Sequence, residues 1–429
     1  MNPYISQFEE AINRAATQFE ETQQQDEVLV TPSVDQPKKP YTLVSAKHVG
    51  YTGIIMFVRE KSRVLRLEDA EVGFGAAEMG NKGAVGLRVL YSKDNNGEME
   101  LTFVATHLAA MEWNLPTRNA NWGAIMRGLT FENPKDVIER HKTGGASPIN
   151  AVPSSDAATD DETAGLLYDG HHEQHISLQQ SLHEISVFKP SSHLFVAGDL
   201  NYRISTTSPP PSAKLPSLDP KSENYYPKFL PLDQLTRERH AGRTMHGLSE
   251  AEVKFPPTYK YVHEPSTNRT DDSGFESKFA THRYPSWTDR ILYLDTPSWV
   301  KGQPPLKVHS YDAMPILESS DHRPVYLRIG VPLISPEHLR PPPELVEQQS
   351  SGSASGSGVS PAALGDPRLR LPVEIDPEAW ERRAAARRKE VMAGWSMFLW
   401  STKQGAWILG MIAATGFAAY WVYYTTVAG

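Results

Sequence analysis

The sequence contains no cysteine among its 429 residues. This absence excludes disulfide bridges, a cysteine nucleophile and a zinc site built from thiolates. A basic excess is also lacking, because 43 lysines and arginines stand against 51 aspartates and glutamates, for a net charge of −8. Proteins that bind nucleic acid usually carry a basic face and a high isoelectric point. The composition therefore argues against a nucleic-acid partner.

Charge is lacking altogether from the C-terminal stretch 404–429. Its apolar core, AWILGMIAATGFAAYWVYYTTV, has about the length needed to cross a hydrocarbon layer of roughly 30 Å. Trp407 lies near one end and aromatic residues crowd positions 420–424, as is typical of the membrane–water interface. A buried core helix is the alternative. We predict a single-pass C-terminal anchor with the rest of the chain facing the cytosol, because basic residues precede it, and the endoplasmic reticulum is one candidate membrane.

Shifts in composition divide the remaining chain. Residues 1–330 alternate predicted strands and helices and include hairpins, which indicates an α/β domain with a mixed sheet and outer helices. Within it, residues 142–173 predict a disordered insertion rich in glycine, serine, proline and acids. The segment 331–372 contains SSGSASGSGVS and predicts a flexible linker. Residues 373–403 predict a basic amphipathic helix that leads into the anchor.

The sequence GDLNYR at 198–203 follows a buried apolar run, so polar side chains gather where a strand ends. The carboxylate of Asp199 could orient or deprotonate a water, and the amide of Asn201 could hold it. Arg203 could either support the backbone or bind an anion. The alternative is simple turn chemistry, because Asp-x-Asn also favours turns.

Two further blocks place charged residues beside strands. PSWTDRIL contains Asp289 and Arg290, and SDHRPV contains Asp321 and His322. A carboxylate next to an imidazole fixes its tautomer and favours its cationic form, which is useful in hydrolysis. Sequence neighbours usually point their side chains apart, so Asp289 is the better candidate to orient His322.

The remaining blocks add one histidine and several cations. His107 ends a strand in ATHLAA, although a lone histidine is more often structural than catalytic. Lys82 lies in the glycine-rich GNKG, where the backbone can approach an anion closely. Tyr259 and Lys260 in FPPTYKY could flank a phosphate. Acids, histidines and cations at strand ends together indicate chemistry on a phosphate with a divalent metal.

The blocks GNKGAV, THLAA, GDLNYR, FPPTYKY, PSWTDRIL and SDHRPV, in this order, resemble the inositol polyphosphate 5-phosphatase catalytic domain. That family belongs to the endonuclease/exonuclease/phosphatase superfamily, and the resemblance spans roughly residues 41–330. It implies a DNase I-like fold, a two-sheet sandwich with helices on both outer faces. It also implies a Mg²⁺-dependent phosphoric monoester hydrolase that removes the 5-phosphate from phosphoinositides, such as phosphatidylinositol 4,5-bisphosphate, or from inositol polyphosphates.

The resemblance also implies roles for individual residues. Asp199 would position or deprotonate the attacking water, helped by Asn201. His322, oriented by Asp289, would contact the scissile phosphoryl group, and His107 would help to hold the developing charge. The implied metal ligand is Asp321, and the implied phosphate-binding residues are Lys82, Arg203, Tyr259, Lys260, Arg283 and Arg290.

The sequence departs from the family pattern at its start. The family begins with a strand that carries Trp-Asn and a strand that ends in Gln-Glu, whose glutamate is the main metal ligand. Neither is found here, and residues 1–15 resemble the helix that follows that glutamate. We therefore expect either an N-terminally incomplete member or another acid in the place of the main metal ligand. Thr288 replaces a usual cysteine, and Thr281 replaces a residue that is often basic.

Two alternatives stay open at this point. A catalytically impaired phosphoinositide-binding membrane protein would explain the missing glutamate. A nuclease of the same superfamily is the second alternative, but the Tyr-Lys and Asn-Tyr-Arg blocks and the sequence isoelectric point near 6.0 oppose it.

Overall fold

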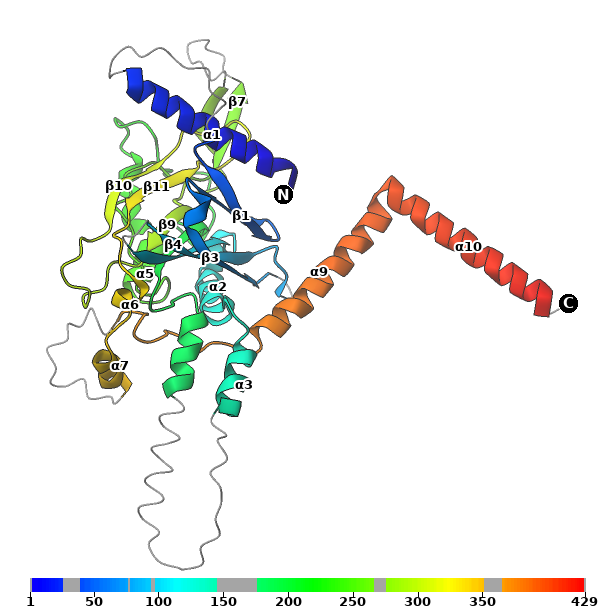
Figure 1. Cartoon of the computed structure of the whole chain (residues 1–429). Helices are drawn as coiled ribbons and strands as arrows, with labels where there is room; N and C mark the ends of the chain where they lie inside the picture. Colours follow the sequence, from blue (N-terminus) through cyan, green and yellow to red (C-terminus); the bar gives the residue numbers. More distant parts are fainter. Residues whose placement is uncertain are drawn as a thin grey trace, which may run out of the picture.

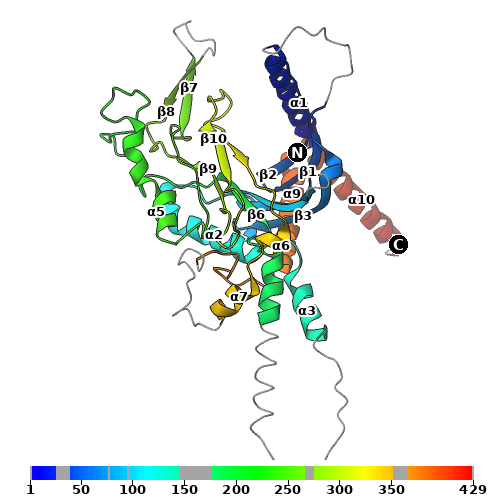
Figure 2. The same cartoon turned by 60° about the vertical axis from the view of Figure 1, so that its left-hand side comes forward.

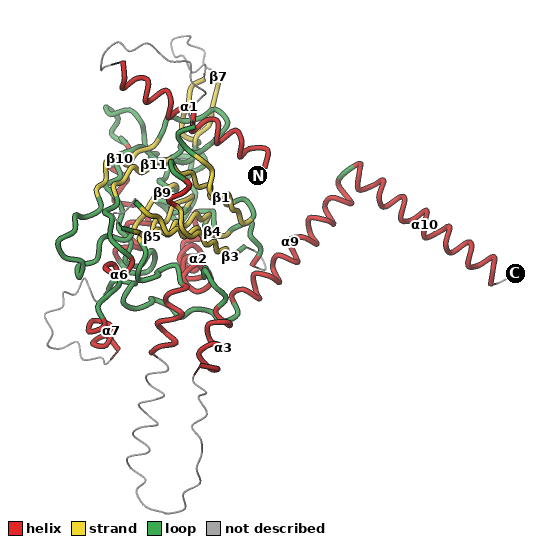
Figure 3. Tube along the Cα trace, in the orientation of Figure 1, coloured by secondary structure: helices red, strands yellow, loops and turns green. Residues whose placement is uncertain are grey.

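A computed structural model describes residues 2–25, 39–75, 78–93, 97–144, 176–265, 275–350 and 365–427. Most of the predicted insertion at 142–173 lies outside the described residues. Strands gather in the middle of the molecule and helices lie around them (Figure 3). The α/β class and the mixed strand directions predicted from the sequence are confirmed.

The main sheet has five strands in the order β3-β4-β5-β6-β9. Their bounds are Val64–Gly73 for β3, Gly83–Ser92 for β4, Glu98–His107 for β5, His193–Asp199 for β6 and Asp289–Tyr293 for β9. Only β5 and β6 pair in parallel among these strands, and the other neighbours are antiparallel. The first four residues of β6 are buried, as expected for an apolar strand at the centre of a covered sheet.

Three two-stranded antiparallel sheets complete the described strands. They pair β1 with β2, β7 with β8, and β10 with β11, with bounds Thr42–Val49, Thr52–Val58, Tyr261–Pro265, Phe275–Phe279, Lys307–Ala313 and Val325–Gly330. The β1–β2 hairpin packs against β4 and β5, whereas β11 packs against β9. The second layer of the predicted sandwich is thus divided between hairpins. Figure 2 shows β7 and β8 side by side at an edge of the molecule.

Helices flank these sheets. They are α1 (Asn2–Gln25), α2 (Leu115–Gly128), α3 (Pro134–Gly144), α5 (Gln234–His240), α6 (Pro336–Leu339), α7 (Pro343–Ser350), α9 (Ala379–Ser401) and α10 (Lys403–Val427), with 3₁₀ turns at Lys61–Arg63, Glu112–Asn114 and Tyr226–Leu232 and a further helical run at 176–185. Trp122 and Ile125 of α2 are fully buried in one core with Val104 and Val196 of the main sheet. This core carries the strand ends that form the site.

The N-terminal helix α1 is tied to the strand that follows it. The side chain of Asn13 donates to the carbonyl of Tyr41 over 3.0 Å and accepts from its N–H over 2.8 Å. Both polar groups of a half-buried amide are therefore satisfied across 28 residues of sequence, which fixes α1 beside β1.

The predicted flexible linker at 331–372 is wrong at both of its described ends. Near its start, Ile334 and Leu339 are buried. Near its end, the buried guanidinium of Arg368 donates to the carbonyl of Asp295 over 2.6 Å, and Leu371 packs against the main core. The proline-rich composition suggested a flexible linker, but the same segment also contains apolar and ion-paired side chains that pack on the domain. Residues 351–364, which include SSGSASGSGVS, lie outside the described residues.

The last two helices leave the body of the molecule. Figure 1 shows α9 running outward from beside α3, and α10 continuing from its end in another direction. The helix α10 reaches a mean hydropathy of 1.4 in its most apolar window, and 6% of that window is buried. It is therefore long and apolar enough to cross a membrane, as the sequence predicts.

The buried histidine His183 makes stability depend on pH. Burial lowers its pKa from 6.5 to about 4, while its Nε2 lies 2.9 Å from the carbonyl of Pro367. Between pH 6.5 and about 4, the ring of His183 therefore stays neutral in the folded state but takes up a proton in the unfolded chain. The stability that comes from burying the neutral ring is complete above pH 6.5 and is lost as the pH falls towards 4. The loss is on the order of 3 kcal/mol.

We expect His183→Gln to flatten this dependence, because glutamine can still donate to the same carbonyl. Urea unfolding of the whole chain in detergent at pH 7 and pH 4.5 measures it. The exposed His309→Gln is the matched control and should behave like the parent chain. Equal acid sensitivity in the parent chain and in His183→Gln would refute the prediction.

Candidate active site

Strand register brings three of the predicted residues into one row. The parallel pairing of β5 with β6 sets His107 opposite Asp199, and the antiparallel pairing of β6 with β9 sets Asp199 opposite Asp289. All three lie at the same edge of the main sheet. Residues that are 92 positions apart along the chain, such as His107 and Asp199, become neighbours for this reason.

Asp199 is held on both of its carboxylate oxygens. The backbone N–H of Asn201 donates to Oδ1 over 3.1 Å, and its side-chain amide donates to Oδ2 over 2.8 Å. Asn201 adopts a positive φ of 57°, which asparagine tolerates better than most residues. Burial alone would raise the pKa of Asp199, but the hydrogen bond from His107 and the charge of His322 outweigh it and lower that pKa. The carboxylate is therefore ionised at neutral pH.

His322 is oriented by an acid from another block. Its Nδ1 donates to Oδ2 of Asp289 over 2.9 Å. The same oxygen accepts from the hydroxyls of Thr258 over 2.7 Å and Thr288 over 2.8 Å. Burial opposes the charged form, but Asp289 and then Asp199 outweigh it and raise the pKa of His322. With Nδ1 committed, Nε2 is the atom of this ring that can reach a substrate.

Cations line the same edge. Nζ of Lys82 contacts Nε2 of His107, which also lies 3.2 Å from Oδ2 of Asp199. Burial lowers the pKa of Lys82, with Asp199 opposing the shift. Nζ of Lys260 donates to Oδ2 of Asp321 over 2.6 Å. Two different blocks therefore each deliver an ammonium group to the site.

Tyr259 packs between two of the other residues. Its ring centroid lies 4.5 Å from that of His322, and the guanidinium carbon of Arg203 lies 4.4 Å from the same ring. The stacked guanidinium adds a cation–π contact of the kind that holds aromatic rings in place.

Two predicted phosphate-binding residues have other partners. Arg290 is buried and donates to Asp233 over 2.9 Å and to Glu250 over 2.5 Å, so its charge is neutralised inside the protein. Burial would lower the pKa of Arg290, but these two acids hold it well above its ordinary value. Arg203 is 4% exposed, and its guanidinium donates to Asn201. These partners give both arginines structural roles, and the binding of substrate phosphate by Arg290 and Arg203 stays a prediction.

Arg283 is partly engaged. Its Nη1 lies 3.3 Å from a carboxylate oxygen of the buried Glu112 and 3.1 Å from the hydroxyl of Ser208. The pairing with Glu112 was not predicted, because that acid lies 171 positions earlier, in the 3₁₀ turn Glu112–Asn114 and outside the sequence blocks that indicated the site. The role of Arg283 in phosphate binding stays a prediction.

Three side chains of the site could together hold a cation. Asp199, Asp289 and His322 each offer one ligand atom, and these atoms lie within 4.8 Å of one another. The donor set fits a divalent cation, because carboxylates are ligands that Mg²⁺ and Ca²⁺ prefer. Asp321 lies at the margin of this group, with Oδ1 4.0 Å from Nε2 of His322, and its predicted role as a metal ligand stays a prediction.

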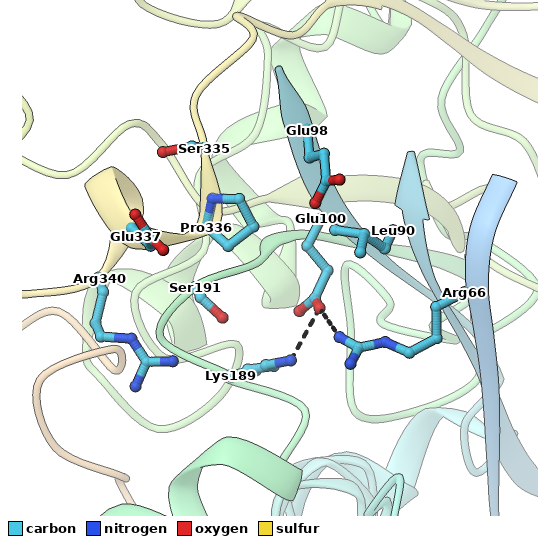
Figure 4. A pocket seen from close by; sticks show the side chains of 10 residues that line it. All are labelled: Arg66, Leu90, Glu98, Glu100, Lys189, Ser191, Ser335, Pro336, Glu337 and Arg340. Carbon is cyan, nitrogen blue, oxygen red and sulfur yellow. Dashed lines mark hydrogen bonds and ion pairs between the residues drawn. The ribbon is translucent and has the colours of Figure 1, made fainter. Parts of the chain in front are cut away.

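A separate pocket of about 500 Å³ opens near the opposite end of β5. Figure 4 shows Glu100 at its centre, paired with Arg66 over 2.7 Å and with Lys189 over 2.8 Å. The nearby Arg340 is paired with Glu184 over 2.7 Å. No histidine is among the residues that line this pocket, so it lacks the carboxylate–imidazole pairs of the strand-end site.

Sequence reasoning missed the two threonines that fix Asp289. The hydroxyl of Thr258 donates to that carboxylate and accepts the backbone N–H of Thr288 over 3.1 Å. Thr258 directly precedes the Tyr-Lys pair, so its position beside a charged block was the available signal. Thr288 stands where the family usually has cysteine, and it supplies a hydroxyl donor there.

The sequence is similar to those of known proteins. Residues 5–328 match the Endonuclease/Exonuclease/phosphatase family 2. Polyphosphatidylinositol phosphatase INP53 of Saccharomyces cerevisiae is 31% identical over 303 residues, which are 70% of this chain and 20% of the yeast protein. Type II inositol polyphosphate 5-phosphatase 14 of Arabidopsis thaliana is 28% identical over 290 residues, 64% of this chain and 22% of the plant protein. This chain spans about a fifth of the length of these relatives.

One solved structure is also similar. It is the inositol polyphosphate 5-phosphatase domain of SPsynaptojanin in complex with inositol (1,4)-bisphosphate and a calcium ion, at 25% identity. The similarity covers 67% of this chain and 61% of that one, with a TM-score of 0.41.

Proposed function

Because the chain belongs to the endonuclease/exonuclease/phosphatase family, as an inositol polyphosphate 5-phosphatase homologue, we propose that it hydrolyses the 5-phosphate of an inositol headgroup. The substrates are phosphoinositides such as phosphatidylinositol 4,5-bisphosphate, or soluble inositol polyphosphates. The observation that carries the proposal is the row of His107, Asp199 and Asp289 at one sheet edge, completed by His322.

The nucleophile is a water held by Asp199. The lowered pKa of Asp199 keeps its carboxylate ionised, so the carboxylate can accept a proton or a hydrogen bond from that water. Asn201 holds both carboxylate oxygens, which fixes the direction from which the water approaches. Positioning of this kind is a large part of what a phosphoryl-transfer enzyme contributes.

His322 and the nearby cations act on the phosphoryl group. Nδ1 of His322 is bound to Asp289 and the pKa of the ring is raised, which favours the charged form, and in that form Nε2 donates a hydrogen bond to a phosphoryl oxygen. His107 stabilises negative charge that develops beside Asp199, and Lys82 next to it binds a substrate phosphate. Tyr259 and Lys260 contact a neighbouring phosphate of the ring.

Mg²⁺ is the proposed cofactor. Asp199 and Asp289 would hold it, and it would supply Lewis-acid stabilisation of the phosphate oxygens. Carboxylate ligands and a phosphate-bearing substrate are the setting in which Mg²⁺ is usually bound.

The location of the chain follows from α10. We propose that α10 is a single-pass C-terminal anchor and that the domain faces the cytosol, with the endoplasmic reticulum as one candidate compartment. The length and hydropathy of α10 support this, as do basic residues on α9 that precede it. A lipid substrate would then lie in the same surface that holds the enzyme.

Positional analysis of the products tests the proposal. The whole chain, reconstituted in vesicles with phosphatidylinositol 4,5-bisphosphate, is expected to yield phosphatidylinositol 4-phosphate in the presence of Mg²⁺ and to stop when the metal is chelated. Release of the 4-phosphate instead would contradict the 5-phosphatase assignment. Nicking of plasmid DNA with Mg²⁺ would favour a nuclease.

A second candidate is a phosphoinositide-binding protein that has lost catalysis. Its signature would be saturable binding of inositol phosphate without turnover.

A further inference from the structure

The C-terminal helix α9 reaches the loop that carries Lys82. This site loop comprises residues 78–82 between β3 and β4. Oε1 of Glu390, on α9, accepts the backbone N–H of Gly80 over 2.6 Å. The contact joins positions that are 310 residues apart, and it lies two residues from Lys82.

Glu390 is itself fixed by an ion-pair chain. Nη1 of Arg383 lies 2.6 Å from Oε1 of Glu390, and Nε of Arg383 lies 2.9 Å from Oε1 of Glu71 on β3. The side chain of Arg383 is only 10% exposed. A charged acceptor that is partly buried and doubly held makes a stronger hydrogen bond than an exposed one.

The β1–β2 hairpin also contacts the site loop. A Cβ atom placed on Gly80 would lie 2.6 Å from Cγ2 of Val49, so hairpin and loop are in close contact there. The loop therefore contacts both the hairpin and Glu390. Its far end leads into β4, where Gly83 pairs with His107 of the proposed catalytic row.

Other contacts hold the first half of α9 on the domain. The indole N–H of Trp380 donates to the hydroxyl of Thr130 over 2.9 Å, and Lys135 pairs with Glu381 over 3.1 Å. Arg387 adds an ion pair of 3.5 Å with Glu71. Basic residues of α9 thus face acids of the domain, and the helix has a fixed place on it.

We propose that Glu390 is a positioning residue that sets the place of the site loop, and with it Lys82, for binding substrate phosphate. The inference rests on the proposed function and deepens it, because it makes the helix that leads into the apolar α10 part of the support of the site. Glu390 does not touch substrate and acts only through Gly80 and the loop.

Two measurements on the whole chain in detergent micelles test this. Glu390→Ala should speed amide exchange in residues 78–83 at least about tenfold, since a charge-assisted hydrogen bond is lost. The KM for soluble inositol 1,4,5-trisphosphate should rise about tenfold, while kcat changes less than twofold. Glu390→Gln keeps an oxygen acceptor for Gly80 and should recover most of both values.

Glu381→Gln is the matched control, because it removes an acid from the same helix that pairs with Lys135 and not with the site loop. It should match the parent chain in both measurements. Unchanged exchange at 78–83 in Glu390→Ala overturns the inference, and so does faster exchange with an unchanged KM.

Failure of the proposed function would look different. If the parent chain turns over no substrate, the Kd for inositol 1,4,5-trisphosphate is measured in place of KM. The rate of amide exchange in residues 78–83, together with this Kd, then decides the role of Glu390. A parallel rise in exchange and Kd supports it, and an unchanged value of either overturns it.

Discussion

Replacing Asp199 by asparagine is expected to lower kcat for phosphate release by about 10²–10⁴-fold, the usual contribution of a positioned acid–base group. Asparagine has nearly the same size but lacks the charge that His107 and His322 stabilise. It can neither accept a proton from water nor serve as a strong ligand for Mg²⁺. Initial rates with phosphatidylinositol 4,5-bisphosphate in vesicles measure the effect.

A matched control separates this loss from unfolding. Asp312→Asn changes an exposed acid on β10 whose carboxylate accepts from the N–H of Ala313, and it should keep the parent rate. Both variants should unfold at similar temperatures. A rate for Asp199→Asn within threefold of the parent chain would contradict the role given to this carboxylate.

Replacing Arg290 by methionine is expected to reduce the free energy of unfolding by about 3–5 kcal/mol, because it leaves buried acids without their cation. Asp233 is fully buried and Glu250 is 3% exposed, and both bind this one guanidinium. Methionine fills much of the same space, so the loss reports on charge rather than on a cavity. Urea unfolding at pH 7 measures it.

The surface pair Arg340–Glu184 supplies the control. Arg340→Met removes a side chain that is 51% exposed, and a loss below about 1 kcal/mol is expected. If Arg290→Met were as stable as the parent chain and raised KM for the inositol phosphate, Arg290 would be a substrate ligand after all.

Local pattern was sufficient to predict the strand ends that carry the site, but not the strands β7, β8 and β10. The apolar run before Asp199 and the polar block after it place a buried strand and a site in adjacent residues. The pairing of Asp289 with His322 also followed from elimination, because adjacent side chains diverge. These inferences needed only neighbours in sequence and the rule that polar groups gather where a buried strand ends.

Roles that depend on distant partners were not predictable in the same way. Arg290 follows Asp289 directly, yet successive residues of a strand point to opposite faces. One side chain therefore lies at the site, and the next enters a core whose acids come from Asp233 and Glu250. The residue type alone could not show which of these two side chains lies at the site and which enters the core.

The prediction of a flexible linker at 331–372 was wrong at its described ends for a related reason. Its composition predicts a flexible linker, but Arg368 finds Asp366 and the carbonyl of Asp295, and Leu369 is buried. These contacts depend on where the domain surface lies, which composition does not encode. As a consequence, α9 begins directly after a segment that is packed on the domain and not after a flexible one.

Mg²⁺-dependent phosphate release is the most direct test of the central claim, that carboxylates and imidazoles from separate blocks act on one inositol phosphate. The parent chain in vesicles with phosphatidylinositol 4,5-bisphosphate and Mg²⁺ should release phosphate steadily, and Asp199→Asn and His322→Asn should each reduce the rate by at least about 10²-fold. Equal rates from the parent chain and both variants would contradict it.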